Sequence, residues 1–133
     1  MSRADALRAD LVRAVDALEA ACSRLSTVGS EDTLLRDGLI QRFEFSFEIA
    51  RKAIQVAAVA EGVTVRSPRT SLAHALQSGW AHDEVLWFRM LEARNLSAHT
   101  YEEALAQRVA REIPSFLPLL RSLISLLPPP SPG

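Results

Sequence analysis

This 133-residue sequence contains a single cysteine, five glycines and aromatic residues at only 6% of its positions. A lone Cys22 excludes an internal disulfide and a cysteine-rich zinc site. Neither His74 nor His82 has a companion at metal-ligand spacing, so we expect no metal site and no cofactor. Basic and acidic residues nearly balance, at 15 against 16, which gives a formal net charge of −1. This balance argues against a surface that is basic throughout and leaves room for a local basic site.

Long apolar runs are also missing from the chain. No run reaches the roughly 18 residues that a membrane-spanning helix needs. The N-terminal segment carries too many charges for the apolar centre of a signal peptide. Apolar residues at 48% and charged residues at 23% are an ordinary globular composition. We therefore expect a soluble cytoplasmic protein with one domain over residues 1–127 and a disordered proline-rich tail over residues 128–133.

Apolar residues recur at steps of three and four along most of the chain, and this period predicts helices. No strand-like alternation of useful length occurs. The last helix contains Pro114 and Pro118, which predict a kink or a split there. The expected fold is all-α, an up-down antiparallel helical bundle of four long helices and one shorter helix. The helices are expected at about 3–26, 32–61 and 67–79, from 83 onward, and from about 101 or 102 onward. Ser30 or Asp32, Ser67 and Asp83 are the expected N-caps.

The reactive side chains gather between Arg94 and Tyr101. An arginine can neutralise a phosphate, a histidine can move a proton near neutral pH, and a tyrosine hydroxyl can be modified. On a continuous helix Arg94 and His99 would point about 140° apart. They converge only if the helix ends or bends between them, or if a second copy supplies the other half. Asn95 and His99 are one turn apart and can share a ligand.

The backbone is expected to turn near Thr100. Glu103 follows it at the spacing of a capping box, which indicates a helix boundary. A simpler interpretation of the cluster remains open at this point. His99 can be a boundary histidine bonded to a carbonyl, and Arg94 a surface ion-pair partner.

A helix rich in phenylalanine precedes this cluster. Phe43 and Phe47 fit the buried stripe better than a platform for stacking bases, whereas Phe45 points elsewhere and can mark a dimer contact. Glu44 and Glu48 lie one turn apart and can serve as acid and base or bind a metal. Pairing with neighbouring cations, or bridging to another helix, is the favoured interpretation.

The pattern Arg94-Asn95-x3-His99 resembles the signature of the HEPN superfamily, small helical bundles found with nucleotides and RNA. Extended to Tyr101, it is similar to that of HepT-type members, which pair with a minimal nucleotidyltransferase. Two further segments resemble the nucleotidyltransferase substrate-binding branch. Residues 39–48 are similar to its Arg-Phe-Glu-Phe-x-Phe-Glu helix, and residues 67–69 to its Ser-Pro-Arg turn. Arg51 departs from this branch, which usually has an aromatic residue there.

This resemblance implies a function for each matched residue. His99 would act as general acid or base, Arg94 would hold the phosphate, and Asn95 would orient one of them in a metal-independent RNase. Tyr101 would receive AMP from the partner nucleotidyltransferase, encoded nearby, and so silence a toxin. The resemblance also implies a homodimer and an RNA or nucleotide ligand. The alternatives are a non-catalytic nucleotide- or substrate-binding module and a structural helical adaptor.

Overall fold

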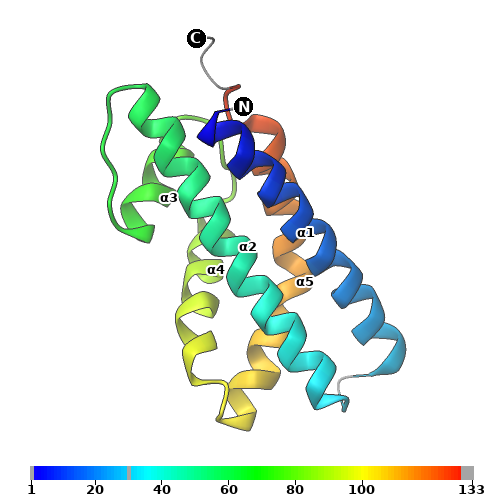
Figure 1. Cartoon of the computed structure of the whole chain (residues 1–133). Helices are drawn as coiled ribbons and strands as arrows, with labels where there is room; N and C mark the ends of the chain where they lie inside the picture. The colour runs from blue at the N-terminus through cyan, green and yellow to red at the C-terminus, as the bar shows by residue number, and fades with distance from the viewer. Residues whose placement is uncertain (1, 30, 130–133) are drawn as a thin grey trace.

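The computed structural model describes residues 2–29 and 31–129, and its fold is the expected all-α bundle. Each of the four long helices runs antiparallel to the long helix before it in the chain, and the short α3 packs beside one end of α2 (Figure 1). No strand occurs among these residues. The helices are α1 (Arg3–Val28), α2 (Thr33–Ala60), α3 (Pro68–Gln77), α4 (Glu84–Leu96) and α5 (Glu103–Leu126), with the 3₁₀ turn η1 (Ser97–His99) after α4.

The expected N-caps at Asp32, Ser67 and Asp83 are confirmed. Each side chain accepts a hydrogen bond from the backbone N–H three residues further on. Such bonds satisfy donors that have no partner within the helix, and therefore define where α2, α3 and α4 begin. Ser30, the alternative cap of α2, lies outside the described residues.

The core lies where α2 packs against α1 and α5. Phe43 and Phe47 are buried, as expected, and the Phe43 ring stacks on Phe116 of α5 with centroids 5.7 Å apart. Phe45, between them, is 55% exposed. In α1, Leu11, Val15 and Leu18 are buried. The periodicity thus located the buried faces correctly.

Of the kink or split expected in α5, the split does not occur, because the helix continues through both prolines from Glu103 to Leu126. Pro114 and Pro118 are exposed, so their rings lie on the solvent side. Each proline removes a backbone hydrogen bond at a cost of about 3 kcal/mol. Seven buried residues on the opposite face hold the helix together: Ala106, Val109, Ala110, Ile113, Phe116, Leu120 and Leu123.

The far end of α5 is tied to α1. The Arg8 guanidinium donates to the carbonyls of Ile124 and Leu127, at 2.9 and 2.6 Å. These carbonyls end the helix and lack a helical partner. Pro128 and Pro129 then follow without helical structure, and residues 130–133 of the expected tail lie outside the described residues. Within the described ranges, no helix combines the length and apolar character needed to cross a bilayer.

Candidate functional site

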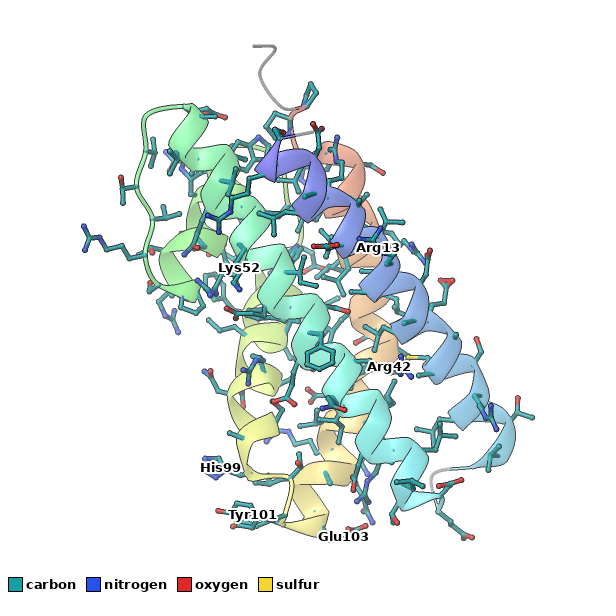
Figure 2. All side chains as sticks on the ribbon, viewed as in Figure 1. Arg13, Arg42, Lys52, His99, Tyr101 and Glu103 are labelled. Carbon is teal, nitrogen blue, oxygen red and sulfur yellow. The ribbon has the colours of Figure 1, made fainter. Side chains whose placement is uncertain are left out.

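The turn expected near Thr100 is confirmed. Helix α4 ends at Leu96, η1 follows, and α5 begins at Glu103. We call residues 97–102 the α4–α5 turn. Figure 2 shows His99 and Tyr101 at this end of the bundle, with Glu103 beside them at the start of α5.

Arg94 is held against α2. Its Nη1 donates to Oε2 of Glu44 and to Oγ of Ser97, both at 3.2 Å. The Ser97 hydroxyl lies 2.8 Å from the same Glu44 oxygen and 2.6 Å from the Arg94 carbonyl. Glu44 therefore bridges α2 to α4, as one interpretation of the sequence expected. Two of the three segments that carry the family resemblance, the phenylalanine-rich helix and the Arg-Asn-x3-His motif, meet at this contact.

His99 and Tyr101 are exposed and contact each other. The His99 Nδ1 lies 3.2 Å from the Tyr101 hydroxyl, and the rings meet edge to face with centroids 5.9 Å apart. Tyr101 is 79% exposed, so its hydroxyl is accessible to another protein. In the part of the chain that the structure describes, no hydrogen bond joins His99 to Arg94.

Asn95 lies on a different part of α4. Its side chain is exposed and lines a shallow hollow together with Arg69 and Phe88. A 3₁₀ turn advances about 120° per residue instead of 100°, so the one-turn register that Asn95 and His99 would share on a continuous helix is lost. The orienting function of Asn95 stays a prediction.

The start of α5 differs from the expected capping box. Thr100 donates its hydroxyl to the Ser97 carbonyl at 3.2 Å, and Glu102, the N-cap residue, has no side-chain cap bond. Glu103 instead accepts from Nη1 of Arg36 at 2.5 Å. Arg36 on α2 is only 4% exposed, and a buried guanidinium needs an acceptor. Glu103 therefore binds Arg36 on α2, and the capping box with Thr100 does not form.

Arg36 is the functional-site residue that sequence reasoning missed. The available signal was its position, because it continues the buried stripe of α2 one turn before Leu39 and Ile40. A charge at such a position indicates a partner on another helix. Arg36 and Glu44, which we call the two α2 clamps, hold the α4–α5 turn from both sides. The turn that presents His99 and Tyr101 is thereby fixed to the longest helix.

The Arg36 clamp makes stability depend on pH. Its hydrogen bond lowers the pKa of Glu103 from the usual 4.5. A lowered carboxyl pKa stabilises the fold above about pH 4.5, and this contribution is lost as the pH falls through the lowered value. We therefore expect Glu103→Gln to reduce the free energy of unfolding at neutral pH, and the difference from wild type to shrink at about pH 3. Urea titrations at both pH values test this, and a difference that stays constant would contradict it.

Glu48 forms the expected ion pair with a neighbouring cation, Arg51. The hydrogen bond from Arg51 lowers the pKa of the Glu48 carboxyl. Across residues 2–29 and 31–129, no group of three or more His, Cys, Asp and Glu side chains is arranged to hold a metal ion.

Comparison with known proteins gives consistent matches. The family described as nucleotidyltransferase substrate binding protein like matches residues 8–127. A Haemophilus influenzae protein named probable ribonuclease HepT is 32% identical over 92 residues, which are 65% of this chain and 62% of that protein's length.

Two solved structures share the fold. A Thermus thermophilus protein is 31% identical with a TM-score of 0.76, over 88% of this chain and 98% of that one. A Haemophilus influenzae protein is 25% identical with a TM-score of 0.78, over 88% of this chain and 96% of that one. The latter structure is described as revealing the fold of a substrate-binding domain of a nucleotidyltransferase.

Proposed function

Because the chain belongs to the nucleotidyltransferase substrate-binding protein-like family, within the HepT-like branch of the HEPN superfamily, we propose that it is the helical subunit of a two-component system. Its partner is a minimal nucleotidyltransferase encoded nearby, and the chain works in the cytoplasm as a homodimer. On its own it acts as a metal-independent RNase toxin, and the transferase silences it by attaching AMP to Tyr101.

Cleavage uses the residues around the α4–α5 turn. A ribose 2′-hydroxyl attacks the adjacent phosphorus, and the bond to the 5′-oxygen of the next nucleotide breaks. His99 takes the proton from the 2′-hydroxyl or gives one to the leaving oxygen. Arg94 holds the phosphate and stabilises the charge that develops on it, and Asn95 orients one of these groups. Since Arg94 and His99 share no hydrogen bond within one chain, the proposed groove combines side chains from two copies.

The contact between His99 and the Tyr101 hydroxyl is the observation that carries the proposal. In the modification, the Tyr101 oxygen attacks the α-phosphorus of ATP, pyrophosphate leaves, and the phenolic proton passes to a base. The product is a phosphodiester with a negative charge and a bulky nucleoside, attached 3.2 Å from the imidazole. Such a group would exclude RNA from His99 by charge and by size.

The second candidate function is a non-catalytic module that presents nucleotide or substrate to the transferase. The net charge of −1 favours it, because an RNase acting alone benefits from a basic groove. Purified wild-type protein that binds the transferase but leaves transfer and messenger RNA intact would establish this function. RNA degradation that Arg94→Ala abolishes would exclude it.

Tyr101→Phe tests the modification. We expect the purified transferase, given ATP labelled in the adenine ring, to label the wild-type chain at one equivalent and the variant at background level. The fold should persist, because Tyr101 is 79% exposed and contributes little to packing. Intact mass spectrometry measures the added AMP. Equal labelling of both proteins would rule out Tyr101 as the acceptor.

A further inference from the structure

A second charged surface lies away from the α4–α5 turn. It is an open hollow of about 650 Å³ where the start of α1, the second half of α2 and the linker from α2 to α3 meet. Lys52 marks its position in Figure 2. We call this hollow the basic groove. It is lined by Arg3, Arg51, Lys52, Gln55, Val56, Val59, Val65 and Arg66.

The groove concentrates positive charge. Four of its lining residues are cationic and none is acidic. Arg51 pairs with Glu48, whereas Arg3, Lys52 and Arg66 form no ion pair with other described residues. With no carboxylate in the lining and three cations that form no ion pair among the described residues, the groove carries local positive charge on a chain whose net charge is −1. It therefore attracts a negatively charged partner.

Valines supply the apolar part of the groove, namely Val56, Val65 and Val59, of which Val59 is 62% exposed. The wall is preformed, since the Gln55 amide donates to the Arg66 carbonyl at 3.2 Å and holds the linker against α2. Apolar side chains beside charged ones are typical of protein–protein interfaces. Among the described residues, no aromatic side chain lines the groove, so it offers no stacking surface for nucleic-acid bases.

The groove and the candidate site are on the same helix but apart. Lys52 lies eight residues beyond Glu44, which clamps Arg94, and this is a rise of about 12 Å along α2. Val59 lies further still, at about 22 Å. Tyr101 lies further away, near the end of α2 where Arg36 binds Glu103, and Arg36 is 16 residues before Lys52, a rise of about 24 Å. A protein seated in the groove would therefore leave Tyr101 uncovered, and its active site would have to reach about that far along the bundle.

We propose that the basic groove docks an acidic surface segment of the nucleotidyltransferase, with apolar side chains that cover the three valines. This inference rests on the proposed function and adds the partner's contact surface to it. Docking anchors the enzyme on α2 and leaves its active site free to reach the exposed Tyr101. Charge complementarity speeds the encounter, and the valines slow dissociation once the surfaces meet.

Charge reversal in the groove tests the proposal. The double variant Lys52→Glu with Arg66→Glu is expected to weaken binding of the purified neighbouring transferase by at least about tenfold, since like charges then face each other. The matched control is Arg24→Glu with Arg111→Glu, which makes the same charge change at two exposed residues outside the groove. The control should bind as wild type does. Binding is measured by calorimetry at two salt concentrations, after circular dichroism has confirmed the fold of each variant.

The outcomes separate this inference from the proposed function. If wild-type protein does not bind the transferase, the proposed function itself fails. If wild type and the groove variant bind equally well, the function stands and the docking surface is refuted. A groove variant that loses affinity for a uridine 12-mer, or its own dimeric state, while keeping the transferase, would assign the groove to RNA or to a second copy instead. Selective loss of transferase binding supports the proposal.

Discussion

His99→Ala is expected to lose RNA-cleaving activity by about 10²–10⁴-fold, the usual contribution of a general acid or base. The imidazole is exposed, and its Nδ1 is within hydrogen-bond distance of the Tyr101 hydroxyl. The substitution should therefore remove proton transfer without disturbing the core. Single-turnover cleavage of purified transfer RNA measures the effect, and growth arrest from the chain expressed alone gives an independent readout. Wild type should arrest growth, and the variant should not.

His82 provides the matched control. It is also an exposed histidine, but it lies in the connection between α3 and α4. His82→Ala should cleave RNA and arrest growth as wild type does. Equal activity of wild type and His99→Ala would refute His99 as the proton-transfer group. Absence of cleavage from both would favour the non-catalytic binding module.

Phe43→Ala is expected to lower the free energy of unfolding by about 3–5 kcal/mol. Its ring is fully buried and stacks on Phe116 at 5.7 Å, so alanine leaves a cavity between α2 and α5. Phe45→Ala, two residues away, should change stability by less than about 0.5 kcal/mol, because that ring is 55% exposed. Urea denaturation followed by circular dichroism measures both.

The same two variants distinguish an effect on monomer stability from an effect on dimer formation. Phe45 was singled out as a possible dimer contact, and its exposure is compatible with one. Light scattering of Phe45→Ala at several concentrations would reveal a weakened homodimer even where monomer stability is unchanged. Comparable losses of stability from Phe43→Ala and Phe45→Ala would contradict the assignment of buried and exposed faces.

The elements predictable from sequence are those determined by neighbours in the chain. Asp32, Ser67 and Asp83 cap helices through the backbone three residues away, and alternating steps of three and four located the core phenylalanines. The helix boundary near Thr100 was also predictable, because Thr100 with Glu103 three residues on is typical of a helix start, although the capping box itself does not form.

The remaining features depend on residues far apart in the sequence. Arg36 meets Glu103 across 67 positions, and Arg94 meets Glu44 across 50. No local pattern specifies such pairs, so the sequence suggested a capping box at Thr100 that a buried guanidinium displaces. Helix α5 also continues through Pro114 because of contacts far apart in the sequence. The packing of its opposite face outweighs the low helix propensity of proline.

The Glu44 clamp also fixes the orientation of the Arg94 guanidinium. Glu44 and Ser97 both engage Nη1, while Nη2 and Nε have no hydrogen-bond partner among the described residues. A free arginine side chain loses about 2 kcal/mol of rotamer entropy when it is immobilised. Here most of that ordering has already occurred during folding. In the proposed function, a phosphate would therefore meet a guanidinium that is already oriented, with Nη2 and Nε still available to donate to it.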